Sequence, residues 1–341
     1  MLKLIICVIA ALLILLFLFA YLCVHFTFGR RCEASSSLKY MTCDDFDGLC
    51  ATSVEFKSNK GQLIRGALYT HQEIDKPLGV AIFVHGMGGG HLSYTTEINT
   101  LAAAGFIVLG YDNTGTIASE GKALGSFYQA VRDLRYALKF VRENDELSKY
   151  KVVLVGHSWG AYAACQVLAY EKVAGVAAFS GPDRTSGIFC DNARTLVGFP
   201  VDYMRPFFAA AAAIAGGKDS WHSSASVLSK TDVPVLLMHG DQDKTVTLKN
   251  SPVSSEKVKA NSHVKIIVYE GRAHNVYQTK ESEKYLGETF GAINAAKKKY
   301  GKKIPKEIRE KIYDIDYSLI TQEDSEVMKT AIDFLRSCIE K

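Results

Sequence analysis

The chain is predicted to fold as one α/β domain with a mainly parallel, doubly wound sheet, preceded by a single apolar helix. Three observations predict this architecture. Short apolar runs typical of buried strands alternate with segments of helical periodicity along most of the 341 residues. One such run, at 152–155, leads directly into the pentapeptide Gly156–Gly160 (Gly-His-Ser-Trp-Gly) and then into a segment rich in helix formers. Residues 4–28 are almost wholly apolar.

Composition limits the class of protein. Hydrophobic residues make up 48% of the chain, which is ample for a core, and the strand–helix alternation favours one large domain with insertions over two small ones. The formal net charge of +4 is modest and spread along the chain, so nothing indicates a nucleic-acid partner. No Cys-x-x-Cys pair or His/Cys cluster has the spacing of metal ligands, so we expect no metal.

The N-terminal apolar segment is long enough to cross a membrane. At about 1.5 Å per residue, Leu4–Val24 spans about 30 Å, the width of a hydrocarbon core. The run is longer than the apolar region of a secretory signal, and no convincing cleavage site precedes Gly29. We therefore expect residues 1–29 to form an uncleaved signal-anchor that makes the protein a single-pass membrane protein.

The charges that flank this segment bear on its orientation. Arg30, Arg31 and Lys39 follow it, and the positive-inside rule would keep them in the cytoplasm. However, large domains translocate largely regardless of charge, and a short N-terminal tail that carries Lys3 usually stays inside. The expectation leans towards a catalytic domain outside the cytoplasm.

A polar linker and then an edge hairpin are predicted after the anchor. Residues 30–50 include Ser35–Ser37 and several aspartates, and we treat them as the linker to a domain over 51–341. Residues 53–57 and 63–69 both alternate apolar and polar side chains, and 58–61 supplies the turn between them. This pattern is typical of an antiparallel hairpin at the edge of a sheet.

The remaining elements follow in regular order. A crossover helix is expected in each connection between parallel strands, as a right-handed doubly wound sheet requires. Strands are predicted near 79–84, 106–111, 151–156, 174–179, 233–239 and 264–269, helices near 92–104, 127–143 and 159–170, and a closing helix over 325–339.

The pentapeptide at 156–160 is typical of a nucleophile elbow. A strand that ends in Gly-x-Ser-x-Gly and runs into a helix raises the serine hydroxyl above the sheet on a strained turn. Side chains two residues before or after the serine would collide with the neighbouring strand and helix, which explains Gly156 and Gly160. The pattern predicts Ser158 as a nucleophile.

Candidates for the base and its carboxylate partner follow two later strands. A serine hydroxyl is a poor nucleophile until a base takes its proton, and the base needs a carboxylate to fix its tautomer. Asp241 and Asp243 follow the strand at 233–239, and His274 follows the strand at 264–269. The chain order is therefore serine, aspartate, histidine.

These motifs closely resemble those of the α/β-hydrolase superfamily, over roughly Val54–Val276, and in particular its serine aminopeptidase and monoacylglycerol-lipase-like branch. The segment 240–246 looks like the family's Gly-x-x-Asp-x-x-Val acid loop, which selects Asp243 over Asp241 as the catalytic acid. Residues 271–274 look like its histidine loop. The resemblance implies an α/β-hydrolase fold with a cap.

The same resemblance implies an oxyanion hole made of two backbone N–H groups. One belongs to Trp159, the residue after the nucleophile. The other belongs to Met87, the residue after the His-Gly pair that ends the strand at 79–84. Three further glycines at 88–90 would let the backbone approach the substrate closely.

Two insertions are expected in the hydrolase domain. The chain detours over about 182–231, where a cap would cover the site, and the apolar, alanine-rich face of this segment would either suit an acyl group or simply pack on the core. A second, basic insertion over about 278–322 could lie against anionic head groups or be a solvated surface. Its basic residues include Lys297, Lys298, Lys299, Lys302, Lys303, Lys306, Arg309 and Lys311.

The predicted activity is that of a serine hydrolase that cleaves carboxylic esters through an acyl-enzyme on Ser158, with no cofactor. The expected partners are a small-molecule acyl substrate, such as an acylglycerol or lysophospholipid, and the membrane. A serine aminopeptidase or amidase shares the acyl-enzyme step and is the alternative enzyme. A non-catalytic, membrane-anchored binding protein on a hydrolase fold is the alternative of another class, and it would be expected to have a broken triad.

Overall fold

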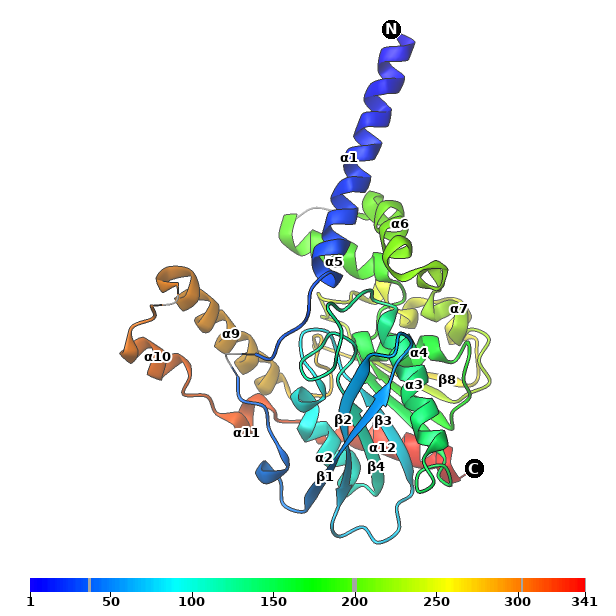
Figure 1. Ribbon diagram of the computed structural model, residues 1–341, viewed down its shortest axis with the longest axis vertical. Coiled ribbons are helices and arrows are strands. Elements are labelled where there is room, and N and C mark those ends of the chain that lie inside the picture. The colour runs from blue at the N-terminus through cyan, green and yellow to red at the C-terminus, as the bar shows by residue number, and fades with distance from the viewer. Residues whose placement is uncertain (36–37, 198–200, 302, 341) are drawn as a thin grey trace.

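One sheet of eight strands organises the domain (Figure 1). The computed structural model describes residues 1–35, 38–197, 201–301 and 303–340. Ser36 and Ser37 of the serine run, Lys302 of the basic insertion and residues 198–200 of the cap lie outside the described residues. The strand order is β1-β2-β4-β3-β5-β6-β7-β8.

The first two strands form the predicted hairpin. β1 (Leu49–Lys57) pairs antiparallel with β2 (Leu63–His71), and β2 pairs antiparallel with β4. All other neighbours are parallel. The strands predicted between residues 79 and 269 are all present, within two residues at their ends. They are β3 (Gly79–Val84), β4 (Phe106–Tyr111), β5 (Val152–His157), β6 (Gly175–Phe179), β7 (Val235–Gly240) and β8 (Val264–Tyr269).

Helices cover both faces of the sheet (Figure 1). α3 (Gln129–Glu143) and α4 (Trp159–Val167) pack on one face, and α2 (Thr95–Ala103) and α12 (Ser325–Glu340) pack on the other. The central strand β3 supplies both cores, because successive side chains point to opposite faces. Val80, Ile82 and Val84 lie in the α3–α4 core, whereas Ala81 and Phe83 lie in the α2–α12 core.

Two of the predicted helical segments differ from the expectation. The segment predicted near 92–104 begins as a 3₁₀ turn, η2 (His91–Tyr94), before α2 starts. The connection from β7 to β8 holds the 3₁₀ turns η5 (Leu248–Asn250) and η6 (Pro252–Ser254) and only the four-residue α8 (Glu256–Lys259). The expectation of a full crossover helix there was wrong, because the first part of this connection is a loop that carries Asp243.

The cap consists of three helices and two 3₁₀ turns. They are α5 (Thr185–Val197), η3 (Asp202–Met204), α6 (Arg205–Gly216), η4 (Lys218–Trp221) and α7 (Ser224–Leu228). α5 packs against α6, where the rings of Phe189 and Phe208 stack with centroids 5.3 Å apart.

The N-terminal helix α1 (Leu2–Phe28) extends away from the cap end of the domain (Figure 1). By length and composition it is able to cross a membrane. Its first two-thirds are mostly exposed, but Ala20, Val24 and Phe28, one helical turn apart, are buried. This buried face packs against α6. α6, the helix that carries the alanine run which the sequence suggested for an acyl group, is thus in contact with α1.

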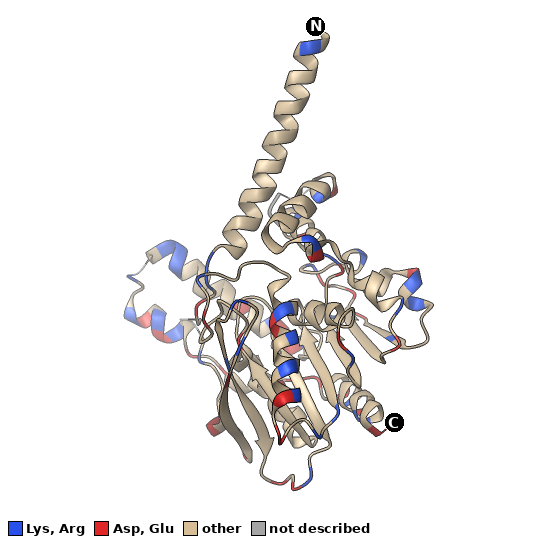
Figure 2. Cartoon of the chain, turned by 45° about the vertical axis from the view of Figure 1, so that its right-hand side comes forward, with Lys and Arg blue, Asp and Glu red and all other residues tan. Residues whose placement is uncertain are grey.

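The basic insertion forms an arm beside the domain. It consists of α9 (Lys280–Tyr300), α10 (Lys306–Ile312) and α11 (Tyr317–Ile320). Figure 2 shows, in blue, Lys and Arg positions gathered at the far end of this arm, on the side of the molecule where α1 leaves it. After α11 the chain returns to the sheet and ends in α12, as the sequence predicted.

Candidate active site

Ser158 stands at the turn between β5 and α4. Its backbone adopts φ 53° and ψ −110°, a strained conformation for a residue with a side chain. A Cβ added to Gly156 would lie 2.5 Å from the carbonyl carbon of Gly160, and one added to Gly160 would lie 2.5 Å from the carbonyl carbon of Val84. Neither position has room for a side chain, so the glycines allow the turn that presents the serine.

Asp243 and His274 are brought together from the ends of neighbouring strands β7 and β8. The distance between Asp243 Oδ2 and His274 Nδ1 is 2.7 Å. Oδ1 of Asp243 accepts hydrogen bonds from the backbone N–H groups of Thr245 (2.8 Å) and Val246 (2.9 Å), which fix the carboxylate from within its own loop. Asp241 has a different partner, since its Oδ1 accepts from the N–H of Gly271 at 2.7 Å.

The surroundings of Asp243 keep it ionised. Burial alone would raise the pKa of this fully buried carboxyl group. Hydrogen bonds from His239 and His274, joined by one from the backbone N–H of Val246, outweigh burial and hold the pKa of Asp243 well below its ordinary value. The arrangement therefore presents a carboxylate to Nδ1 of His274, which leaves Nε2 free to accept a proton.

The loop after β3 is fixed from two sides. A Cβ on Gly86 would lie 2.6 Å from the hydroxyl of Tyr94, so this position requires glycine. His85 is buried, and its Nε2 accepts a hydrogen bond from the N–H of Asn113 at 3.0 Å. Met87 follows, with a partly exposed side chain, and lines the same cavity as Trp159.

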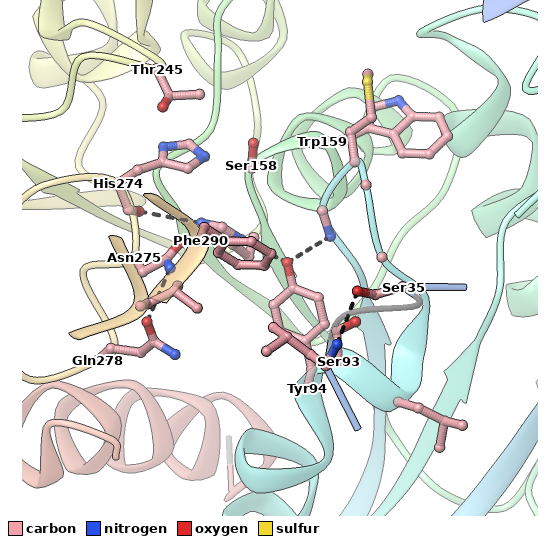
Figure 3. A pocket seen from close by; sticks show the side chains of 18 of the residues that line it. Ser35, Ser93, Tyr94, Ser158, Trp159, Thr245, His274, Asn275, Gln278 and Phe290 are labelled. Carbon is pink, nitrogen blue, oxygen red and sulfur yellow. Dashed lines mark hydrogen bonds between the residues drawn. The ribbon is translucent and has the colours of Figure 1, made fainter. Parts of the chain in front are cut away.

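A hydrogen-bonded chain that the sequence did not reveal joins this loop to the histidine loop. The N–H of Gly86 donates to the hydroxyl of Tyr94 (3.0 Å), which lies 2.8 Å from Nδ1 of His157. Nε2 of His157 lies 3.3 Å from the carbonyl oxygen of His274. Figure 3 shows the dashed lines of this chain.

The direction of the hydrogen bonds in this chain follows from its ends. Burial, and then the nearby His274, lower the pKa of His157, so the imidazole is neutral. A carbonyl can only accept, so Nε2 of His157 carries the hydrogen and Nδ1 accepts from the hydroxyl of Tyr94. Tyr94 and His157 lie 63 residues apart, and no sequence pattern indicates their pairing.

A cavity of about 630 Å³ lies in front of Ser158. Ser158, His274, Met87 and Trp159 all line it, and Figure 3 shows several of its lining side chains. The indole N–H of Trp159 donates to the carbonyl oxygen of Phe127 at 2.6 Å, which holds the ring in the cavity wall. Among the described residues of the cap, those that line the cavity belong to α5.

Comparison with known proteins identifies the family. The model of the Alpha/beta hydrolase family matches residues 81–283, more than half of the chain. The chain belongs to the α/β-hydrolase family. The match begins within β3 and ends within α9, so it covers the elbow and both loops that carry Asp243 and His274. α1 and most of the arm lie outside it.

Solved structures support the same fold for this α/β hydrolase. An esterase from Pyrococcus furiosus is 17% identical with a TM-score of 0.58, covering 79% of this chain and 98% of that one. A lipase in its open form is 15% identical with a TM-score of 0.54, covering 86% and 100%. The acylaminoacyl peptidase of Pyrococcus horikoshii is 16% identical with a TM-score of 0.53, covering 68% and 38%. No curated protein matches the chain.

Proposed function

We propose that this hydrolase cleaves carboxylic esters through an acyl-enzyme on Ser158. The observation that carries the proposal is the 2.7 Å contact between Asp243 and His274, beside the cavity into which the strained turn presents Ser158. In this mechanism Nε2 of His274 takes the proton of Ser158 as the oxygen attacks the acyl carbonyl. Asp243 orients the imidazole and stabilises the imidazolium that forms.

The proposed oxyanion hole consists of the backbone N–H groups of Met87 and Trp159. Negative charge develops on the carbonyl oxygen during attack, and each such donor stabilises the transition state by about 3 kcal/mol. The imidazolium then gives its proton to the leaving alcohol, and water hydrolyses the acyl-enzyme with His274 again as the base.

The lining of the cavity favours a lipid-like acyl group over a peptide with a free amine. Phe28, Phe127, Phe189 and Ile188 supply an apolar wall that suits an acyl chain. Among the described lining residues there is no Asp or Glu, and an aminopeptidase needs a carboxylate there to bind the amine of its substrate. An acylglycerol or lysophospholipid is the substrate class that we propose.

We further propose that α1 anchors the protein in the membrane as a single-pass segment, with the catalytic domain outside the cytoplasm. The burial of Ala20, Val24 and Phe28 against the cap supports an uncleaved helix, since removing it would expose the apolar face of α6.

The basic end of the arm is proposed to contact anionic head groups at about 1 kcal/mol per basic residue near the surface. Trypsin cleavage at the arm lysines of the full chain should then be slower in vesicles with anionic lipid than in zwitterionic vesicles. Equal cleavage rates would show that the arm is only solvated.

Labelling with a fluorophosphonate tests the proposed chemistry. The full chain in detergent should react, and Ser158→Ala and His274→Ala should abolish the reaction. Ser93→Ala is the matched control, because Ser93 lines the same cavity and should leave labelling intact. Failure of the folded wild-type protein to react would favour the non-catalytic binding protein.

A further inference from the structure

The segment that follows α1 is bound along its length to the loop between β4 and α3. The N–H of Gly125 donates to the carbonyl of Phe28 (2.9 Å), and the N–H of Leu124 donates to the carbonyl of Arg30 (3.0 Å). Cys32 makes a short bridge with the same loop, donating to Gly115 and accepting from Ile117. The predicted linker is therefore not a free tether where it leaves the helix.

Arg31 strengthens this attachment through three backbone carbonyls. Its guanidinium donates to Ile117 (2.8 Å), Ser119 (3.0 Å) and Gly121 (2.6 Å). Hydrogen bonds from a charged group are stronger than neutral ones, and a fork of three holds the side chain in one geometry. We call this contact the Arg31 clamp.

Further along, the same segment crosses to the other side of the cavity. The N–H of Lys39 donates to the hydroxyl of Tyr317 on α11 (2.7 Å), and the hydroxyl of Thr95 on α2 donates to the carbonyl of Met41 (2.8 Å). The segment is thus fixed to the arm and to the sheet domain in turn.

Two parts of the chain outside the family match, one before it and one after it, each form a wall of the cavity. One wall comes from the foot of α1 and the segment after it, and the other comes from the arm. The lining residues of these walls are Thr27, Phe28, Ser35, Leu38, Lys39, Tyr40 and Met41 on the first, and Leu286, Phe290, Tyr317, Ile320 and Thr321 on the second.

The position of these walls relative to a bilayer follows from the burial pattern of α1. The mostly exposed part, Leu2–Phe19, is about 27 Å long at 1.5 Å per residue, close to the thickness of a hydrocarbon core. Burial against the cap begins at Ala20, and the cavity-lining Phe28 is about 12 Å further along the helix. The cavity therefore lies just outside the membrane region when α1 spans it.

We infer that the foot of α1, together with Ser35 and residues 38–41, forms the acyl subsite, into which a single-chain lipid ester passes directly from the adjacent leaflet. The inference rests on the proposed function. The ester lies at Ser158, and the acyl chain lies between the foot of α1 and the arm. A cavity of about 630 Å³ is of the size that holds one drug-sized ligand, which fits one acyl chain and not two.

The first experiment compares two esters on a narrowed subsite. Leu38→Trp replaces the half-buried leucine side chain of the first wall with a larger indole ring, which narrows the cavity. We expect the ratio of kcat/KM for a lysophospholipid in vesicles to kcat/KM for a soluble butanoyl ester to fall at least tenfold. Leu78→Trp, at an exposed position outside the cavity, should leave the ratio unchanged.

The second experiment loosens the attachment without touching the cavity. Arg31→Ala removes the clamp and should lower hydrolysis of the lysophospholipid in vesicles at least fivefold relative to the same lipid in detergent micelles. Arg30→Ala removes a neighbouring, exposed positive charge and should leave the vesicle-to-micelle ratio as in the wild type.

The outcomes separate this inference from the proposed function. A wild-type chain that hydrolyses the butanoyl ester, with both ratios unchanged in Leu38→Trp and Arg31→Ala, overturns the acyl subsite and leaves the esterase intact. A wild-type chain that neither hydrolyses an ester nor reacts with a fluorophosphonate overturns both. The inference is supported if the lysophospholipid-to-butanoyl ratio falls in Leu38→Trp and the vesicle-to-micelle ratio falls in Arg31→Ala, while the control variants keep the wild-type ratios and still hydrolyse the butanoyl ester.

Discussion

The loops at the edge of the sheet and the segments outside the family match, namely α1, the segment after it and the arm, hold their side chains in different ways. Asp243 is fixed by N–H groups two and three residues further along its own loop, and Ser158 by a turn that two nearby glycines permit. The walls formed by α1, the segment after it and the arm depend on contacts between distant residues, such as those of Arg31 with 117–121. The turns that present Ser158 and Asp243 are thus set by neighbouring residues, whereas the proposed acyl subsite depends on contacts between distant parts of the chain.

The largest effect is expected from the carboxylate of Asp243, on which the proposed chemistry depends. Asp243→Asn should lower kcat about 10³- to 10⁴-fold, because the amide no longer fixes the productive tautomer of His274. Asp241→Asn is the matched control, since Asp241 braces the N–H of Gly271, and it should change kcat less than fivefold. Steady-state kinetics on the butanoyl ester decide between them; equal losses would contradict the assignment of Asp243.

The same substitution should have opposite effects on stability in the core and in the arm. Gly160→Ala forces a side chain against the backbone of Val84, so we expect a loss of about 3 kcal/mol or more, or no folding. Gly287→Ala adds a methyl group to α9 where nothing lies within 4 Å, and helix propensity should add about 0.5–1 kcal/mol. Thermal unfolding of both variants measures the difference, and a stable Gly160→Ala variant would mean that the elbow can relax.

The place where the arm rejoins the core should respond to pH. Burial raises the pKa of Glu323 to about 7, although a hydrogen bond from Thr100 opposes the shift. The folded state therefore keeps a proton that the unfolded state, with a carboxyl pKa near its ordinary value of 4.5, has lost.

The contribution of Glu323 to the free energy of unfolding is fully present below pH 4.5. It is lost as the pH rises towards 7, at about 1.4 kcal/mol per pH unit. Denaturant unfolding of Glu323→Gln should show a shallower decline of the free energy of unfolding with pH than the wild type. Parallel curves for the two proteins would rule out this contribution.

A smaller effect is expected from the link between the oxyanion loop and the histidine loop. Tyr94→Phe removes the hydroxyl that accepts from Gly86 and donates to His157, a loss of about 1–2 kcal/mol. We expect kcat on the butanoyl ester to fall about tenfold with little change in KM, because the proposed donors near Met87 act mainly in the transition state. Tyr170→Phe, at an exposed position in the turn that follows α4, is the control. A rise in KM alone would assign Tyr94 to substrate binding instead.

The strands and the elbow could be predicted, and the candidate triad residues proposed, because each is marked by a short run or motif of neighbouring residues. The strands are short apolar runs, and the Gly-x-Ser-x-Gly spacing follows from the room that Gly156 and Gly160 must leave. The choice of Asp243 over Asp241 as the candidate acid required the resemblance to the family, since spacing alone did not exclude Asp241.

The rest depends on contacts that no local pattern encodes. The alanine run of α6 was compatible with an acyl-binding face or with packing on the core, and no local pattern indicated that small side chains on this helix would also let α1 approach it. Leu38 and Met41 belong to a polar segment without periodicity, and only the fold brings them to the cavity.

The burial of Ala20, Val24 and Phe28 against the cap also makes the joint between helix and domain stiff. A transmembrane helix adjusts to the thickness of a bilayer mainly by tilting. In the membrane-anchored arrangement that we propose, any such tilt would carry the whole hydrolase domain with it, so that the lipid chain length of the surrounding membrane would set the angle at which the domain leans over the surface.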